Sequence, residues 1–207
     1  MLSLNEKFTI LFIGDSITDC GRSRENPEIT GSGYPYQLSA QLGSDYAELD
    51  LRFLNLGISG NRAKDLKARW EKDCLSFKPD IVSILIGVND VWRRYDKNDP
   101  TSTADFRSSY LSILQALQPL NCQIVMMEPF LLPVPQDRKA WREDLDPKIT
   151  AVRELASEFA DVYVPLDGIF ASAACRHENK YWAPDGVHPS AQGHALIASS
   201  WREFAGI

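Results

Sequence analysis

Near its N-terminus the chain reads Leu11-Phe12-Ile13-Gly14-Asp15-Ser16-Ile17-Thr18-Asp19. The apolar, strand-like run that precedes this block ends at Gly14, and a hydroxyl follows two residues later at Ser16. Open parallel sheets bind their ligands in a crevice at the carboxyl ends of the strands, where a side chain just after a first strand points. Ser16 is therefore the first candidate functional residue.

Strand-like runs recur along the chain, and helix-like stretches separate them. The predicted strands are Phe8–Ile13, Arg52–Leu56, Ile81–Ile86, Gln123–Met127 and Val162–Val164. Apolar residues at helical spacing predict helices over Lys64–Phe77, Asp105–Leu117, Ile149–Phe159 and Ser190–Phe204, the last with Ser190 as its N-cap. This alternation predicts an α/β fold with a parallel sheet covered on both faces. Two segments, Asp19–Gly33 and Pro129–Asp146, are expected to be long loops, which are often functional.

Composition and charge exclude several classes of protein. The 207 residues suffice for one domain, which we expect to span residues 1–207, and 44% of them are apolar. The net charge of −6 disfavours binding to nucleic acid or to anionic membranes, which favour basic surfaces. We expect no secretion signal and no membrane-spanning helix, hence a cytoplasmic location. The four cysteines form no CxxC pair and are expected to be free thiols.

Four short polar blocks follow strand-like runs or lie near the C-terminus. They are Gly14-Asp15-Ser16, Asn55-Leu56-Gly57-Ile58-Ser59-Gly60-Asn61, Gly87-Val88-Asn89-Asp90 and Asp185-Gly186-Val187-His188. Because the carboxyl ends of parallel strands share one edge of the sheet, we expect these blocks to converge there.

The residues in these blocks suit acyl transfer. Ser16 needs a base to become a nucleophile, and His188 is the candidate base. Asp185, three residues before it, is the candidate that orients the imidazole. The backbone N–H groups of Ser16 and Gly60 and the amide of Asn89 are candidate donors to an oxyanion, and one such donor typically lowers the barrier by roughly 3–4 kcal/mol.

Together the four blocks resemble the SGNH hydrolases, also called the GDSL esterase family, whose letters name the Ser, Gly, Asn and His of the blocks. The resemblance extends from Ser16 to His188. It implies a flavodoxin-like three-layer α/β/α sandwich with a five-stranded parallel sheet. It also implies a catalytic triad of Ser16, Asp185 and His188, with Gly60 and Asn89 as oxyanion donors. Ile17 stands where the family often has leucine, a change between two aliphatic residues.

Longer matches are similar to one branch of this family, the intracellular acetylxylan esterases. They are Asp15–Arg22, Gly57–Asn61 and Ile86–Arg93. The similarity implies removal of acetyl groups from xylo-oligosaccharides, and relatives that often form homo-oligomers. Because the triad and the oxyanion donors supply the chemistry themselves, we expect no cofactor and no metal. Among the aromatic residues near the blocks, Trp92 and Trp182 are the best candidates to stack on a sugar.

Other functions remain open at this stage. The same machinery serves lysophospholipases, thioesterases and other short-chain acyl-ester hydrolases. A phosphate-binding α/β domain with Asp15 or Asp19 at a strand end is disfavoured, because neither GxxxxGK nor GxGxxG occurs. The spacing of His177, His188 and His194 matches no common zinc motif. We expect His194 to be packed and His177 to be solvated, and we expect Arg62, Arg93 and Arg94 either to bind substrate hydroxyls or to pair with nearby carboxylates.

Overall fold

The computed structural model describes residues 1–207 and contains one five-stranded sheet. The strands are β1 (Thr9–Gly14), β2 (Arg52–Asn55), β3 (Ile81–Leu85), β4 (Gln123–Met127) and β5 (Val162–Val164). Their order in the sheet is β2-β1-β3-β4-β5, and all four neighbouring pairs are parallel. The predicted strands are confirmed to within one or two residues at their ends.

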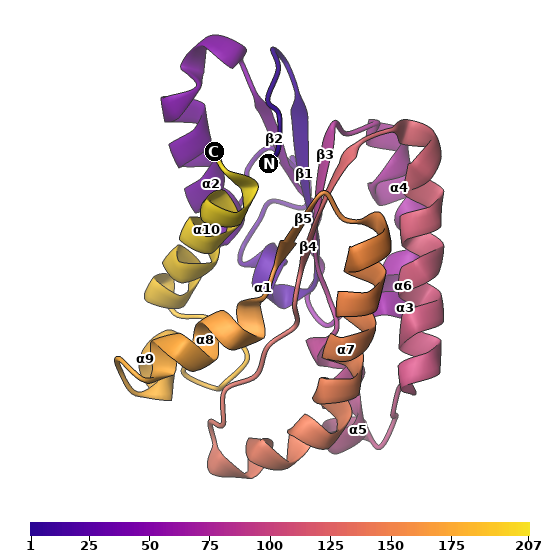
Figure 1. Cartoon of the computed structure of the whole chain (residues 1–207), viewed down its shortest axis with the longest axis vertical. Coiled ribbons are helices and arrows are strands. Elements are labelled where there is room, and N and C mark those ends of the chain that lie inside the picture. The colour runs from indigo at the N-terminus through magenta and orange to yellow at the C-terminus, as the bar shows by residue number, and fades with distance from the viewer.

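Helices cover both faces of the sheet (Figure 1). They are α1 (Ser16–Asp19), α2 (Tyr34–Asp45), α3 (Ala63–Ala68), α4 (Trp70–Asp73), α5 (Val88–Lys97), α6 (Thr103–Leu117), α7 (Arg142–Phe159), α8 (Leu166–Ala174), α9 (Asn179–Trp182) and α10 (Ala191–Ala205). Short 3-10 helices are η1 (Ala47–Leu49), η2 (Leu75–Phe77), η3 (Gln118–Leu120) and η4 (Gln136–Trp141). The predicted three-layer α/β/α architecture is therefore confirmed.

The pleat of the strands divides the hydrophobic core between the two faces. In β1, Ile10 and Phe12 point into a core with α2 and α10, while Leu11 and Ile13 point into a core with α3, α4 and α6. Successive side chains of a strand point to opposite faces, so a fully apolar strand supplies both layers. Trp201 of α10 is fully buried against the first face and donates from its indole nitrogen to Ser83 Oγ at 3.0 Å.

The predicted helix over Lys64–Phe77 is wrong as a single element, because the chain forms α3, α4 and η2 there. The first break falls at Arg69, which caps α3 and precedes α4. Its guanidinium donates to the carbonyl oxygens of Leu56 and Gly14, at 2.8 and 3.1 Å, and so joins this segment to the ends of β1 and β2. These long-range contacts favour a turn over a continuous helix.

Two further predictions concern α7 and α10. The expected loop Pro129–Asp146 is shorter than predicted, because η4 and the first turns of α7 occupy its second half. Ser190 is confirmed as the N-cap of α10, since its Oγ accepts the backbone N–H of Gly193 at 3.1 Å.

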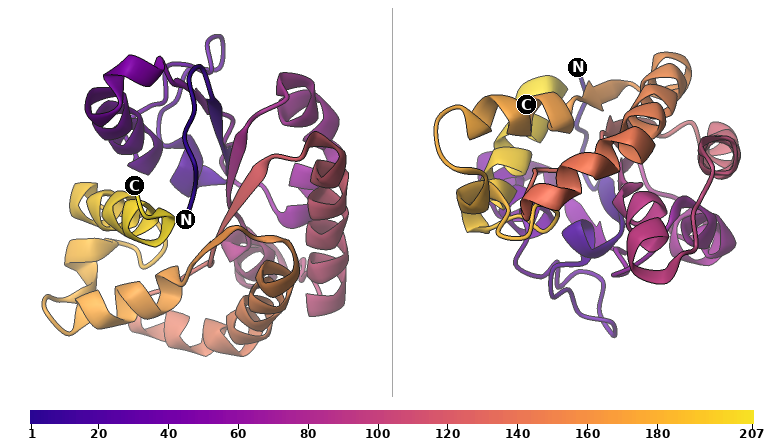
Figure 2. Two further views of the ribbon diagram at one scale, coloured as in Figure 1. Left: turned by 45° about the horizontal axis from the view of Figure 1, so that its top comes forward. Right: turned by 90° about the horizontal axis from the view of Figure 1, so that it is seen from below.

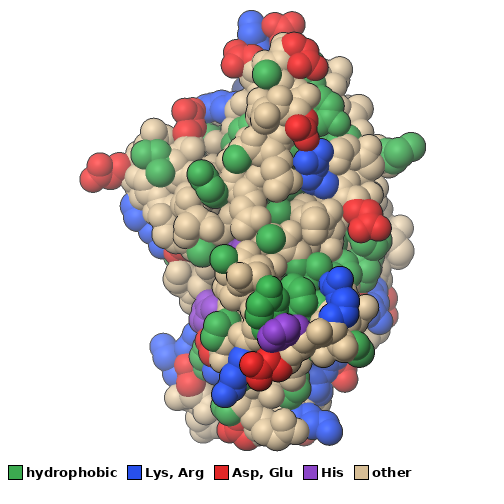
Figure 3. Space-filling model, turned by 90° about the vertical axis from the view of Figure 1, so that its left-hand side faces the viewer, with side chains coloured by type: hydrophobic (Ala, Val, Ile, Leu, Met, Phe, Trp, Pro, Cys, Tyr) green, Lys and Arg blue, Asp and Glu red, His purple; other side chains and the backbone are tan.

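Acidic and basic side chains are interspersed over the face that carries α2, α8 and α10 (Figure 3). None of the helices has the length and hydropathy needed to span a bilayer.

Candidate active site

Ser16 lies where β1 ends and α1 begins. Gly14 has no side chain, and a Cβ there would overlap the carbonyl oxygen of Leu85 on β3. This close approach lets β1 run on to the carboxyl edge of the sheet. Asp15 then caps α1 by accepting the N–H of Ile17 at 3.0 Å. The turn leaves Ser16 half-buried at the edge of the sheet. Figure 2 (left) shows the helices on both sides of this sheet.

Asp185 and His188 lie in the loop between α9 and α10. Ser16 Oγ is 2.9 Å from His188 Nε2, and His188 Nδ1 is 2.7 Å from Asp185 Oδ2. The other carboxylate oxygen accepts the backbone N–H groups of Val187 and His188 at 3.0 and 2.7 Å. Gly186 makes this tight loop possible, because its φ of +81° and its contact with the Leu132 carbonyl oxygen leave no room for a Cβ. The structure therefore brings the three predicted triad residues together.

Asp185 and His188 shift each other's pKa in directions that favour their charged forms. Burial acts to raise the pKa of Asp185, but the hydrogen bonds from the His188 ring and from two backbone N–H groups outweigh it and hold that pKa well below its ordinary value. The hydrogen bond to Asp185 raises the pKa of His188 above its ordinary value of 6.5, against the effect of burial. The carboxylate thus stays ionised beside an imidazole that it makes more basic.

Besides the N–H of Ser16, the candidate oxyanion donors come from the segments after β2 and β3, the strands on either side of β1. Gly60 is exposed, and its φ of +82° lies in the left-handed region. Asn89 is buried at the start of α5, and its Nδ2 donates to the carbonyl oxygen of Asn61 at 3.1 Å. Its Oδ1 accepts from Arg93 at 3.0 Å. Arg93 thereby fixes which end of the amide is the donor, and the bond to Asn61 joins the second block to the third.

Asp19 holds the Gly60 turn in place, a role that the sequence did not indicate. Asp19 is buried, and its Oδ2 accepts both the N–H of Ser59 at 2.9 Å and the Ser59 hydroxyl at 2.6 Å. Arg24 pairs with the same oxygen at 2.5 Å. A buried carboxylate with three donors is a rigid anchor, so the residue before Gly60 has little freedom.

Two more carboxylates are buried near the nucleophile. Burial raises the pKa of Asp15 and that of Asp90 to about 7 in each case. Asp90 Oδ2 accepts the N–H of Ala63 at 3.0 Å, and its Oδ1 has no partner. Neither carboxylate is hydrogen-bonded to the ring of His188, where Asp185 occupies Nδ1. Asp15 instead caps α1, and Asp90 accepts the N–H of the first residue of α3.

The two candidate sugar-stacking residues are placed differently. The half-buried ring of Trp92 lies 5.7 Å from the ring of His188, measured between centroids. Trp182 lies on α9 against Tyr181, and its indole nitrogen is buried without a hydrogen-bond partner. Trp92 thus borders the triad, whereas Trp182 packs against the hydrophobic core and lies under the guanidinium of Arg176.

The remaining polar candidates pack against the protein itself. Each of the three arginines pairs with a carboxylate: Arg62 with Asp99, Arg93 with Asp96, and Arg94 with Glu143 and Asp144. His194 is buried, accepts the N–H of Tyr34 at 3.1 Å and has a pKa that burial lowers to about 4. His177 is exposed and lies against Tyr181.

Arg138 is a further residue of the site that the sequence did not single out. It lies on η4, within the segment Pro129–Asp146 that was expected to be a functional loop. Its Nη1 donates to the carbonyl oxygen of Asp185, and its guanidinium lies over the rings of Trp92 and Trp141. The length of that segment was the one available signal, and it did not distinguish this arginine from its neighbours.

Comparisons with known proteins identify the family of this chain. The profile of the GDSL-like lipase/acylhydrolase family matches residues 12–196. An acetylxylan esterase of Geobacillus stearothermophilus is 38% identical over 200 residues, which cover 93% of this chain and 91% of that protein. The crystal structure of Axe2, an acetylxylan esterase of the same organism, superimposes with a TM-score of 0.92 at 36% identity, over 100% of this chain and 97% of that one.

A second solved structure extends the similarity to another organism. A protein described as a GDSL-like lipase from Parabacteroides merdae superimposes with a TM-score of 0.93 at 37% identity, over 99% of this chain and 98% of that one. The family profile covers the segments of all four blocks. The chain therefore belongs to the GDSL-like lipase/acylhydrolase family and is a carboxylic ester hydrolase with a serine nucleophile.

Proposed function

We propose that this enzyme removes acetyl groups from carbohydrate, with acetylated xylo-oligosaccharides as its substrates, through an acyl-enzyme on Ser16. The observation that carries the proposal is the continuous contact from Ser16 Oγ through His188 to Asp185, at 2.9 and 2.7 Å. Nucleophile, base and orienting carboxylate are within hydrogen-bond reach of one another, as covalent acyl transfer requires.

The first half-reaction forms the acyl-enzyme. Ser16 Oγ attacks the acetyl carbonyl carbon while His188 Nε2 takes the hydroxyl proton. The resulting oxyanion accepts hydrogen bonds from the N–H groups of Ser16 and Gly60 and from the second amide hydrogen of Asn89. When the tetrahedral intermediate collapses, the bond between the carbonyl carbon and the sugar oxygen breaks. His188 returns the proton to that oxygen, and the sugar leaves as an alcohol.

The second half-reaction releases acetate. A water molecule attacks the acetyl carbon of the ester on Ser16, and His188 removes its proton. Collapse of this second intermediate breaks the bond to Ser16 Oγ, which recovers its proton from His188. The ionised Asp185 stabilises the imidazolium in both halves, in keeping with the low pKa of its carboxyl.

Two observations support a short acyl group on a sugar. Trp92 offers a half-buried ring beside the base; the Arg138 guanidinium lies over this ring at 4.5 Å, so a sugar would stack on its other face. The relative from Geobacillus stearothermophilus is an acetylxylan esterase. In the cytoplasm, which we propose as its location, such an enzyme would meet imported oligosaccharides.

The experiment that tests this function compares acyl lengths and sugar substrates. We expect kcat/KM to fall from acetyl to butyryl to octanoyl esters, because each methylene without room costs roughly 1–3 kcal/mol of transition-state binding. Acetate release from acetylated xylo-oligosaccharides is measured alongside, with the Ser16→Ala variant as the blank. A preference for octanoyl esters, together with no acetate from the sugars, would instead indicate a lysophospholipase or thioesterase.

A further inference from the structure

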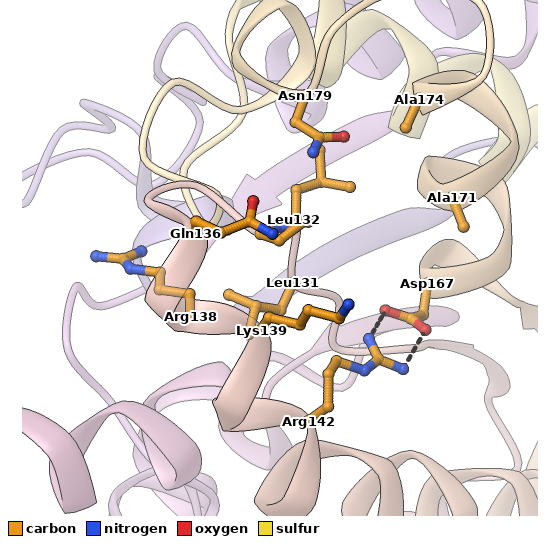
Figure 4. Close-up of a pocket in the computed structure, with 11 residues that line it drawn as sticks. Leu131, Leu132, Gln136, Arg138, Lys139, Arg142, Asp167, Ala171, Ala174 and Asn179 are labelled. Atoms are coloured by element: carbon orange, nitrogen blue, oxygen red, sulfur yellow. Dashed lines mark hydrogen bonds and ion pairs between the residues drawn. The ribbon is translucent and has the colours of Figure 1, made fainter.

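A cavity of about 410 Å³ opens between η4 and the helices α8 and α9 (Figure 4). Leu131, Leu132, Ala171 and Ala174 supply its apolar wall. Gln136, Lys139 and Asn179 bring amide and ammonium groups to it. A pocket with an apolar wall and a few polar groups is typical of small-molecule sites.

The cavity lies at the same edge of the sheet as the triad. Leu131 and Leu132 follow the carboxyl end of β4, and α8 follows the carboxyl end of β5. Arg138 lines the cavity and also donates to the carbonyl oxygen of Asp185. Arg138 therefore borders both this cavity and the loop of the catalytic base.

The charge around the cavity is opposite to that of the whole protein. The chain carries a net charge of −6, yet the lining of this cavity contains three cations, Arg138, Lys139 and Arg142, and one carboxylate, Asp167. Arg142 is committed to Asp167 through two hydrogen bonds, at 2.7 and 2.8 Å. Arg138 is committed to Asp185 and to two indole rings.

The ammonium of Lys139 is the remaining cation. The only hydrogen bonds or ion pairs among the residues drawn in Figure 4 join Arg142 to Asp167. The side-chain polar groups of Lys139, Gln136 and Asn179 make no such bond to the other residues drawn. An ammonium is a compact point charge that suits an anion, and amides suit the hydroxyl groups of a sugar.

We propose that this cavity is a subsite for a sugar unit that carries a carboxylate, with the Lys139 ammonium as the group that recognises the anion. The apolar wall would contact the C–H groups of the ring, and Gln136 and Asn179 would bind its hydroxyls. The inference rests on the proposed action on acylated oligosaccharides. It adds that chains with an acidic sugar are preferred over neutral chains of equal length.

The first test measures a ratio, namely kcat/KM for acetylated xylo-oligosaccharides that carry a hexuronic acid branch over that for unbranched ones. We expect Lys139→Gln to lower this ratio roughly two- to fivefold, the range of an exposed ion pair. The matched control is Lys67→Gln, an exposed lysine of α3, which should leave the ratio unchanged. An equal ratio in wild type and Lys139→Gln overturns the subsite while the proposed function stands.

The second test is independent of turnover. Deacetylated oligosaccharides with and without the hexuronic acid branch are titrated into the Ser16→Ala protein by calorimetry. We expect the acidic chain to bind more tightly, with an advantage that shrinks in high salt and is lost when Lys139→Gln is added. Equal binding of the two chains overturns the subsite, whether or not acetate is released in the first test. A lack of acetate from any oligosaccharide contradicts the proposed function, and the titration then decides the subsite alone.

Discussion

The guanidinium of Arg138 lies over the indole of Trp92, with Cζ 4.5 Å from the ring centroid. Trp141 lies against the same guanidinium, at 4.8 Å, and Nη1 donates to the carbonyl oxygen of Asp185. Arg138 therefore joins η4 to the loop that carries the candidate base. Its positive charge also opposes the rise in the pKa of His188 that Asp185 causes.

Arg138→Met is expected to change the pH profile as well as the rate. Without the cation of Arg138, the charges of Asp185 and Asp15 raise the pKa of His188 further. The acid limb of kcat/KM should therefore move to higher pH. Looser positioning of the Asp185 loop should also cost about tenfold in kcat. Arg107→Met, at a partly buried arginine of α6 that pairs with Glu154, is the control. An acid limb that stays in place would show that Arg138 does not act on the base.

Ser16→Ala is expected to lower kcat by roughly four orders of magnitude or more, because no nucleophile remains to form the acyl-enzyme. The hydroxyl is half-buried, and its one side-chain contact is with His188, so the thermal unfolding curve should be unchanged. A serine-directed organophosphate should label the wild-type protein at Ser16 and leave the variant unlabelled. Near wild-type turnover of the variant would remove Ser16 from the mechanism.

His188→Ala should reduce kcat more than Asp185→Asn, by roughly ten- to a hundredfold, because the base survives in the second variant and loses only its orienting partner. In the wild type, His188 must be neutral to accept a proton. Since its pKa is raised, kcat/KM should fall on the acid side from a pH above 6.5. A profile that is flat from acidic to neutral pH would argue against His188 as the base.

Asp90 gives a prediction about stability. Burial raises its pKa from 3.8 to about 7, against the Ala63 hydrogen bond and the charges of Lys148 and Arg62, which lower it. The folded state therefore keeps a proton that the unfolded chain releases between these values. The contribution of this bound proton to the free energy of unfolding is complete below pH 3.8 and is lost as the pH rises to about 7.

Asp90→Asn abolishes this titration. We compare the free energy of unfolding of the variant with that of wild type by urea denaturation at two pH values. The difference, variant minus wild type, should be larger at pH 8 than at pH 5 by on the order of 2 kcal/mol. The control is Asp50→Asn. Asp50 is exposed and its backbone is in the left-handed region, a conformation that asparagine tolerates. A difference between Asp90→Asn and wild type that is the same at both pH values would contradict the raised pKa.

The arrangement of strands and the order of the blocks could be predicted from local patterns. Apolar runs such as Ile81–Leu85 are long enough to identify strands buried on both faces, and alternation with helices implies a parallel sheet. Parallel strands place their carboxyl ends at one edge, so the blocks of Ser16, Gly60 and Asn89 had to approach each other. Capping by Ser190 was also visible, because it depends on a residue only three positions away.

The tertiary structure alone decided the contacts that hold this site. Arg138 meets a carbonyl 47 positions away, and Asp19 meets Ser59 across 40 positions. The turn at Arg69, where a single helix was predicted, depends on a carbonyl 55 positions away at Gly14. Local propensity responds to neighbours within a helical turn or a strand pair, whereas these hydrogen bonds exist only after the chain has folded. The chemistry could therefore be inferred from residue types in order, while its positioning residues could be found only in three dimensions.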